Sequence, residues 1–443
     1  MPPVNSGALW KEMISLGGLQ RLKGRGFFRN IMVVMSGTAL AQLIGFAFSP
    51  VLSRLYGPME FGIFGSYLSV VGVLSAAATL NYTDALMLPR SDDEAAPLFL
   101  VACLSTVALA FGTGLFCLLA PGAWLQACGM GNLGRCLWFL PFSVLVLGLG
   151  QSLTSWCVRM QAFKKTSQSQ IMRSLTACAS QAVGGLGGPS GTGLIAGVVL
   201  ADTTLAAFLG RTALAQHRPL FLASARWPIL RRMAKEYRQF PIYGCPQAVM
   251  NSVSQGIPVL VLAHYYGMVT AGAYAFGIRL LQVPMNFVLT SLRQVLFQKL
   301  AHIHSTGGDL FSPFLRSTGA LIAISIVPSC VGFLVAPSLF VFVFGEQWRQ
   351  AGEFSRWLIF WLSPMFCNVP SSLTARILRL QRTLLLLDIA LLSSRAAILV
   401  VGGIWLRSIQ TVIAFSLVGA AFNIAFVIYM ALHLWRGRKE SHA

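Results

Sequence analysis

The chain has 443 residues, of which 56% are hydrophobic and only 10% are charged, whereas about 25% are charged in ordinary soluble domains. This composition excludes a soluble globular protein. A membrane-spanning helix takes about 20 mostly apolar residues, so about 12 such helices account for nearly all the apolar residues. The formal net charge of +20 is typical of proteins that bind nucleic acid or anionic lipid, or of basic loops that set membrane topology.

Apolar stretches predict twelve transmembrane helices, and hence an all-α polytopic membrane protein. The fifth and sixth stretches are separated by the glycine-rich sequence Gly184–Pro189, which indicates either a turn or a re-entrant segment. In chain order, the predicted spans are residues 31–52, 61–83, 97–120, 136–157, 171–189, 192–210, 241–263, 271–292, 314–336, 355–375, 383–403 and 409–434.

Lysines and arginines divide unequally between the two sides of these spans. One side receives 24 of them and the other receives 5, so by the positive-inside rule the basic side, with both termini, is cytoplasmic. Most of the net charge therefore reflects topology, and nucleic-acid binding loses its support. The longest basic connection lies at the midpoint. We predict a basic tail at 1–28, six-helix lobes at 29–210 and 241–435, an amphipathic linker at 211–240 and a cytoplasmic tail at 436–443.

The two lobes carry an internal repeat. Pro50–Leu52 resembles Pro258–Leu260, and a second group of matches follows at a constant offset of 210 residues. Because each copy begins on the same side of the membrane, the lobes are predicted to be parallel repeats related by an axis along the membrane normal. The matched pairs of this second group are Gly57 with Gly267, Gly62 with Gly272, and Phe64 with Tyr274.

Four segments resemble bacterial polysaccharide and O-antigen flippases of the Wzx type, within the multidrug/oligosaccharidyl-lipid/polysaccharide exporter superfamily. They are Ser49–Gly62, Leu80–Pro89, Gly272–Pro284 and Gln294–Phe297. The resemblance implies transport of an undecaprenyl-pyrophosphate-linked oligosaccharide across the bacterial inner membrane by alternating access. It also implies a monomeric transport unit that serves lipopolysaccharide or exopolysaccharide synthesis beside a polysaccharide polymerase and assembly proteins.

Arginines inside or at the ends of spans are the candidates for binding the diphosphate. The guanidinium group donates paired hydrogen bonds to phosphate oxygens and stays protonated in low dielectric. Arg279 lies inside a span, five residues before Pro284, and is predicted to face the transport cavity because exposure to lipid is costly. Its alternative role is a structural pair with an acidic neighbour such as Asp202 or Asp388. The further substrate-binding candidates are Arg173, Arg395 and Arg54.

The few acidic residues near spans are candidates for ion coupling. Asp202 and Asp388 fall in the middle of predicted spans, and Asp84 is predicted to approach the cytoplasmic interface. Each either binds a coupling H⁺ or Na⁺ or neutralises an arginine in a static ion pair. No other cofactor and no metal is expected, because the cysteines and histidines lack ligand spacing.

Two further expectations concern the linker and the rival functions. The segment Trp227–Lys235 is basic and amphipathic and is predicted to lie on the anionic lipids of the cytoplasmic leaflet. A membrane glycosyltransferase, such as a polysaccharide polymerase or ligase, is the rival from another class, but its large outward loop is missing from the predicted topology. A peptidoglycan-precursor flippase and a cation or drug antiporter share the superfamily fold and stay open as alternatives.

Overall fold

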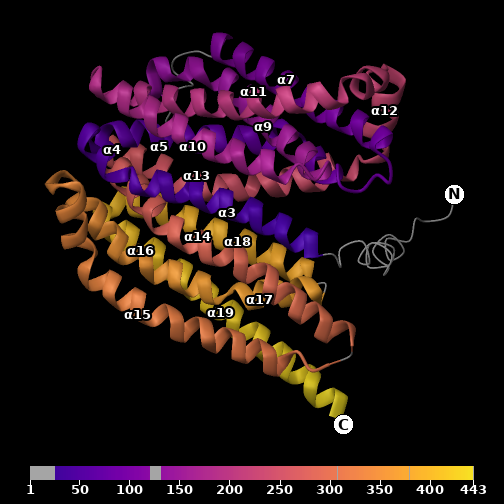
Figure 1. The fold of residues 1–443 in the computed structure, drawn as a ribbon. Coiled ribbons are helices and arrows are strands. Elements are labelled where there is room, and N and C mark those ends of the chain that lie inside the picture. The colour runs from indigo at the N-terminus through magenta and orange to yellow at the C-terminus, as the bar shows by residue number, and fades with distance from the viewer. Residues whose placement is uncertain (1–24, 120–130, 307, 379, 443) are drawn as a thin grey trace.

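The computed structural model describes residues 25–119, 131–306, 308–378 and 380–442. In hydrocarbon every backbone N–H and C=O needs a partner, and a helix supplies these partners within one segment. The chain accordingly folds into long helices joined by short connections (Figure 1). The elements of the first half are α3 (Arg25–Ala47), α4 (Ser49–Leu55), α5 (Pro58–Ala78), α6 (Tyr82–Ala85), α7 (Asp92–Leu119), η1 (Gly131–Phe139), α9 (Leu140–Arg159), α10 (Phe163–Leu186) and α11 (Gly191–Ser224).

The second half begins with a short amphipathic helix and continues with long helices. Its elements are α12 (Trp227–Glu236), η2 (Phe240–Gly244), α13 (Cys245–Tyr266), α14 (Met268–Ser305), α15 (Phe311–Phe344), η3 (Glu346–Trp348), α16 (Arg349–Cys367), α17 (Val369–Ile377), α18 (Gln381–Trp405) and α19 (Ser408–His442).

The prediction of an all-α polytopic membrane protein is confirmed. Within the described residues, eight helices are long and apolar enough to cross a membrane by length and composition. The helices α10, α13, α14 and α16 fall outside this group, although each has at least 19 residues. They carry more polar side chains, as expected of helices that line a polar interior.

The sequence around Gly184–Pro189 indicated either a turn or a re-entrant segment. In the structure, the chain on either side of it forms two full helices. The helix α10 ends at Leu186 and α11 begins at Gly191. The Ser190 hydroxyl caps α11 by accepting a hydrogen bond from the Gly193 N–H at 3.3 Å, as serine does at many helix N-termini. The glycine-rich stretch therefore ends one helix and precedes the next.

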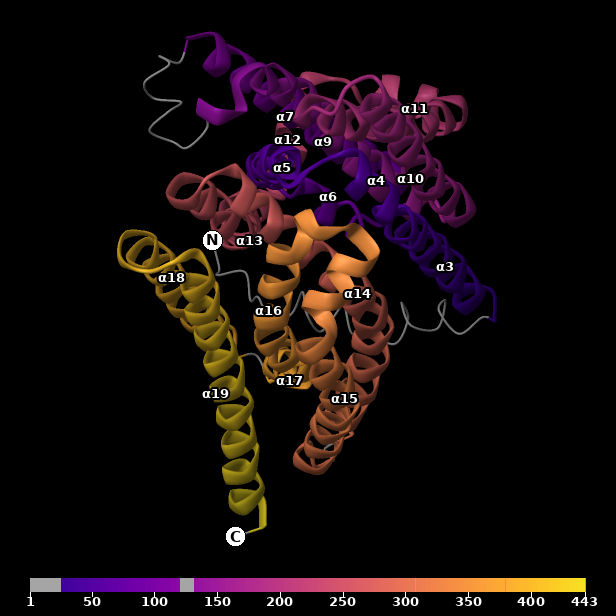
Figure 2. The ribbon, with the colours of Figure 1, turned by 90° about the vertical axis from the view of Figure 1, so that its left-hand side faces the viewer.

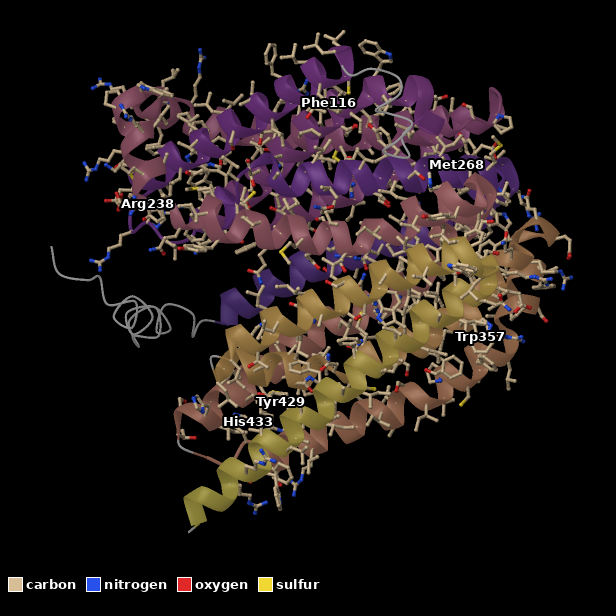
Figure 3. All side chains as sticks on the ribbon, turned by 180° about the vertical axis from the view of Figure 1, so that it is seen from behind. Phe116, Arg238, Met268, Trp357, Tyr429 and His433 are labelled. Carbon is tan, nitrogen blue, oxygen red and sulfur yellow. The ribbon has the colours of Figure 1, made fainter. Side chains whose placement is uncertain are left out.

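The helices form two bundles. The helices α3 to α11 make the N-terminal bundle, and α14 to α19 make the C-terminal bundle, with α13 packed against both α5 and α14 (Figures 1 and 2). We call the end that carries α12 and the end of α19 the basic end. Arg238 and His433 lie toward this end, whereas Met268 lies at the opposite end, which we call the hairpin end (Figure 3).

The bundles are interlocked at the hairpin end by a reciprocal glycine contact. A Cβ atom at Gly62 would overlap the Met268 carbonyl, and one at Gly272 would overlap the Pro58 carbonyl. Each contact maps onto the other under the offset of 210 residues found in the sequence, so the two repeats meet about a pseudo-twofold axis. Only glycine allows this approach of α5 to α14.

Aromatic side chains and one carbonyl complete the closed hairpin end. The rings of Phe61 and Phe276 lie 5.2 Å and 4.0 Å from that of Trp348, which is fully buried. The Ser53 carbonyl at the end of α4 accepts hydrogen bonds from Gln347 Nε2 at 2.7 Å and Trp348 Nε1 at 3.0 Å. These contacts join α4 and α5 to η3 of the other bundle.

The amphipathic helix α12 packs part of its apolar face against protein, while Trp227 is exposed. Leu230 and Met233 are buried, and Met233 belongs to a small core with Tyr82 and Leu98. The Tyr82 hydroxyl donates to the Ala234 carbonyl at 3.1 Å. The helix is thus fixed to the N-terminal bundle, while its arginines are exposed at the basic end.

Candidate functional site

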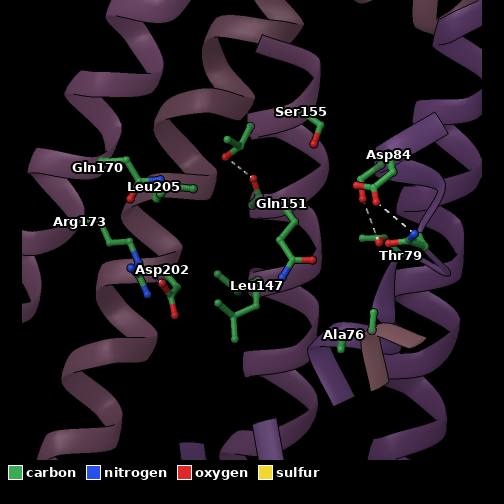
Figure 4. Close-up of a pocket in the computed structure, with 16 residues that line it drawn as sticks. Ala76, Thr79, Asp84, Leu147, Gln151, Ser155, Gln170, Arg173, Asp202 and Leu205 are labelled. Carbon is green, nitrogen blue, oxygen red and sulfur yellow. Dashed lines mark hydrogen bonds and ion pairs between the residues drawn. The ribbon is translucent and has the colours of Figure 1, made fainter. Parts of the chain in front are cut away.

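An open cavity of about 530 Å³, with a mixed polar and apolar lining, lies on the N-terminal bundle. It is lined by α5, α6, α9, α10 and α11 and by Ala248 of α13 (Figure 4). Three residues predicted from the sequence line it, namely Asp84, Arg173 and Asp202. The fold thus brings together side chains from three elements that are far apart in the sequence.

A break in the backbone places Asp84 at this cavity. Leu80 and Asn81 have φ angles of 47° and 60°, in the left-handed region that non-glycine residues adopt at a cost. The break ends α5 and starts α6, and Asn81 Nδ2 donates to Asp84 Oδ2 at 3.1 Å. Asp84 is therefore held by its own turn rather than by an arginine.

Arg173 and Asp202 form an ion pair between α10 and α11. The Asp202 side chain is 7% exposed and that of Arg173 is 40% exposed. The carboxylate is thus buried behind the guanidinium, which faces the cavity. The structure therefore pairs Asp202 with Arg173, and not with Arg279.

Arg279 faces the space between the two bundles. It lies on α14, which continues through Pro284, and its side chain is exposed although protein atoms surround it, as expected in an internal lumen. Its guanidinium lies within electrostatic range of Arg173 and Cys178 on α10. Within the part of the chain that the structure describes, no carboxylate pairs with it.

Arg395 occupies a different environment, in the core of the C-terminal bundle. It is 6% exposed, and its guanidinium lies over the rings of Trp361 at 4.1 Å and Phe415 at 4.7 Å. Gly419 leaves room for it, since a Cβ atom there would overlap Nη2. Nε and Nη2 have no hydrogen-bond acceptor among the described residues, so cation–π contacts are the interactions that the structure provides.

The remaining two predicted residues lie away from the cavity. Asp388 is exposed on α18, within electrostatic range of Arg376 on α17, and no described contact joins it to Arg395. Arg54 is exposed in the last turn of α4, beside the interlocked hairpins. The structure thus groups three of the seven predicted residues at the cavity, while Arg279 lies on the other bundle, within electrostatic range of Arg173.

Sequence reasoning missed two groups of residues. Gln151 and Gln170 line the cavity. The feature of the sequence that could have identified them is a polar amide in the middle of an apolar helix, as at Gln151. Gln347 and Trp348 join the bundles at the hairpin end. Nothing in the local sequence pointed to that contact, because its acceptor is a backbone carbonyl nearly 300 residues earlier.

The comparisons with known proteins give the family. The sequence profile described as "Polysaccharide biosynthesis protein" matches residues 51–353, more than half of the chain. The chain belongs to this family. A curated relative, the "Succinoglycan biosynthesis transport protein ExoT" of Rhizobium meliloti (strain 1021), is 26% identical over 306 residues, which are 68% of this chain. The match spans 59% of that relative's length.

Solved structures share the fold over most of the chain. An inward-facing multidrug resistance MATE family transporter of the MOP superfamily gives a TM-score of 0.74 at 12% identity, covering 92% of this chain and 99% of that one. The lipid II flippase MurJ, in an inward closed conformation, gives 0.65 at 12% identity, covering 91% and 90%. The outward-facing MATE family transporter gives 0.56 at 13% identity, covering 92% and 96%.

These matches bear on the rival interpretations. The predicted relationship to polysaccharide-biosynthesis proteins is confirmed by the family profile, and the predicted helical architecture is confirmed by the shared fold. The named relative is a transport protein, and the structural neighbours are transporters and a flippase. The shared fold does not separate a polysaccharide exporter from a lipid II flippase or a drug antiporter, so the substrate has to be argued from the site.

Proposed function

We propose that the protein is a flippase that moves an undecaprenyl-pyrophosphate-linked oligosaccharide from the cytoplasmic to the periplasmic leaflet by alternating access. The basic end faces the cytoplasm, with both termini, and the hairpin end faces the periplasm. In this orientation the interlocked hairpins close the periplasmic side. The higher TM-score with the inward-facing than with the outward-facing transporter supports this state.

The observation that carries the proposal is the environment of Arg279. Placing a charged side chain in the middle of a membrane costs about 2.5–3.5 kcal/mol on insertion scales. This cost is not offset unless the charge meets a group of opposite charge. Arg279 is solvent-accessible, faces α10 across the lumen and pairs with no described carboxylate. Its charge is therefore available to an anion that enters the lumen.

A diphosphate matches this charge better than a cationic drug does. The guanidinium fork donates two parallel hydrogen bonds to phosphate oxygens, and the electrostatic repulsion between Arg279 and Arg173 is relieved when an anion lies between them. The arginines belong to different bundles, so a bound diphosphate also draws the bundles together.

The ion that drives transport acts through the acidic residues. Asp202 and Asp84 at the cavity, and Asp388 in the other bundle, are the groups that a coupling H⁺ or Na⁺ binds. Asp202 is the strongest of the three, because its carboxylate is buried at the cavity and its charge is balanced, among the described residues, only by Arg173. A diphosphate that attracts Arg173 loosens this pair and leaves the carboxylate ready for a cation.

The test is replacement of Arg279. We expect Arg279→Ala to insert in the membrane at normal abundance and to abolish export. Arg279→Lys is expected to restore export only in part, because an ammonium keeps the charge but loses the bidentate fork. The measurement is polysaccharide export together with membrane abundance, in cells that lack the native gene.

The matched control is Arg407→Ala, because Arg407 lies in the short connection between α18 and α19, away from the lumen. It should leave export and abundance unchanged. Normal export by an abundant Arg279→Ala protein would refute the diphosphate site. Accumulation of a lipid-linked peptidoglycan precursor after gene deletion, instead of a polysaccharide precursor, would assign a different lipid-linked substrate.

A further inference from the structure

Two amide side chains face the cavity without a partner. Gln151 lies in the middle of α9 and Gln170 lies on α10, and both line the cavity (Figure 4). The structure gives neither amide a hydrogen bond among the described residues. In Figure 4, Gln151 is drawn between the Arg173–Asp202 pair and Asp84.

Amides that are accessible and have no internal partner can bind a ligand with hydrogen-bonding groups. Gln151 is exposed and Gln170 is partly exposed, so both amides are open to a ligand that enters the cavity. Each glutamine offers two donors and an acceptor oxygen. Around them the lining adds hydroxyl groups, from Thr79, Thr83 and Thr154 among others. A volume of about 530 Å³ is in the usual range of small-molecule sites, about 300–1,000 Å³.

The charges of the lining exclude the diphosphate from this cavity. Two carboxylates, Asp84 and Asp202, stand against the one guanidinium of Arg173, so the formal charge is negative. Asp84 accepts from Asn81 and Asp202 is bound to Arg173.

The threonine hydroxyls are engaged within the protein, Thr79 with Thr83 and Thr154 with the Gly150 carbonyl. The uncommitted groups among the described lining residues are thus the neutral amides of Gln151 and Gln170 and the Ser155 hydroxyl, which match the hydroxyl groups of neutral sugars.

Arg173 marks the junction between the cavity and the lumen. It lines the cavity and lies within electrostatic range of Arg279. In a lipid-linked oligosaccharide the first sugar is bonded directly to the diphosphate, so a diphosphate held at Arg279 places that sugar near Arg173. We propose that the cavity of the N-terminal bundle is a sugar subsite, in which Gln151 and Gln170 bind the first neutral sugars while Arg279 holds the diphosphate. This inference rests on the proposed function.

The experiment compares two probes on the purified full-length protein in lipid nanodiscs. One probe is undecaprenyl diphosphate without sugar, and the other is the lipid-linked oligosaccharide that accumulates in cells lacking this gene. The variant is Gln151→Leu with Gln170→Leu, which removes both amides and keeps apolar helices. The matched control is Gln168→Leu, because Gln168 is exposed on α10 and does not line the cavity.

We expect the double variant to lose affinity for the oligosaccharide probe by about tenfold, as the loss of two hydrogen bonds implies. Its affinity for undecaprenyl diphosphate should match that of the wild type, which also shows that the variant is folded. Gln168→Leu should match the wild type with both probes. Arg279→Ala should weaken both probes.

The outcomes separate this inference from the proposed function. If the wild type binds neither probe, the proposed function fails and the inference fails with it. If the wild type binds both probes and the double variant binds them equally well, the inference fails while the proposed function stands. A double variant that changes only the dependence on H⁺ or Na⁺ would assign the amides to ion coupling and overturn the sugar subsite.

Discussion

Three arginines of the membrane interior meet three different environments, and the environment decides what each can bind. Arg173 lies against the carboxylate of Asp202, Arg395 lies against two aromatic rings, and Arg279 lies in a lumen. The first charge is neutralised inside the protein and the second is held by ring quadrupoles. The third has no counter-charge among the described residues, so Arg279 dominates the proposed diphosphate site.

The ion pair of Arg173 and Asp202 leads to a testable prediction about the stability of the protein. Asp202→Asn leaves the guanidinium without its anion, and Arg173→Met leaves a carboxylate buried without its cation. We expect each single change to destabilise the protein by about 1–3 kcal/mol. The double variant Arg173→Met with Asp202→Leu should recover most of this loss, because no charge is then stranded. The measurement is the melting temperature of the purified protein.

The control for this pair is an exposed one. Arg349 and Glu346 form an ion pair whose side chains are 61% and 68% exposed, and water screens such surface pairs so that they contribute little to stability. Arg349→Gln should therefore change the melting temperature little. A double variant at Arg173 and Asp202 that is no more stable than the single variants would contradict the pairing.

Sequence alone predicted the depth of these charges but not their partners. The position of a residue along an apolar span gives its distance from the membrane surface at about 1.5 Å per residue. It does not tell which other helix that face meets. Arg279 and Arg395 therefore looked alike in the sequence, whereas the fold places one in a lumen and the other beside Trp361 and Phe415.

At the scale of elements, the contact of α5 with α14 depends on two glycines. Gly62 and Gly272 let each helix approach a carbonyl of the other. We expect Gly62→Ala and Gly272→Ala each to destabilise the protein by about 1–3 kcal/mol, the usual cost of overpacking. The measurement is again the melting temperature, with membrane abundance beside it.

The control for Gly62 lies on the same helix, and the control for Gly272 lies on the following helix. Gly72 lies on α5 and Gly319 on α15, and a Cβ atom at either would meet nothing within 4 Å. Alanine at these positions should be neutral or slightly stabilising, because alanine favours helix more than glycine does. Equal stability of Gly62→Ala and Gly72→Ala would show that the interlock does not hold the bundles together.

The elements themselves were largely predictable, because hydropathy and the repeat are properties of the sequence. The offset of 210 residues anticipated the match of Gly62 with Gly272, and the fold shows these residues in reciprocal contacts. The break at Gly184–Pro189 was ambiguous, since glycine and proline end a membrane helix as readily as they re-enter it. Packing of α10 against α11 resolves it into two helices.

The amphipathic linker illustrates a limit of the same kind. Its pattern indicates an apolar face but not what covers that face. In the fold, Leu230 and Met233 of α12 are buried against the N-terminal bundle, and the basic residues remain exposed. The apolar face of an amphipathic helix beside a membrane can thus contact either lipid or protein, and the sequence does not distinguish between the two.

At the scale of the whole molecule, the two bundles are closed at the hairpin end by the packing of α5 against α14 and by hydrogen bonds from η3 to α4. The Ser53 carbonyl accepts from Gln347 and Trp348, and the glycine interlock lies beside it. The proposed alternating access requires that these contacts break so that a substrate at Arg279 reaches the other side. Figure 2 shows the N-terminal and C-terminal helices as two bundles, so the expected movement is one bundle turning against the other.

A covalent link across the hairpin end should therefore stop transport without preventing binding. We expect Gly57→Cys with Gln347→Cys, bridged by a short thiol-reactive cross-linker, to lose movement of the lipid-linked oligosaccharide across proteoliposome membranes, because a Cβ atom at Gly57 would lie 3.7 Å from Gln347 Oε1. Binding of undecaprenyl diphosphate should persist, since the basic end stays open. The single variants, treated with the same reagent, should transport normally. Transport at the wild-type rate by a fully cross-linked protein would show that the hairpin end does not open, and would contradict rocking of the two bundles as the transport movement.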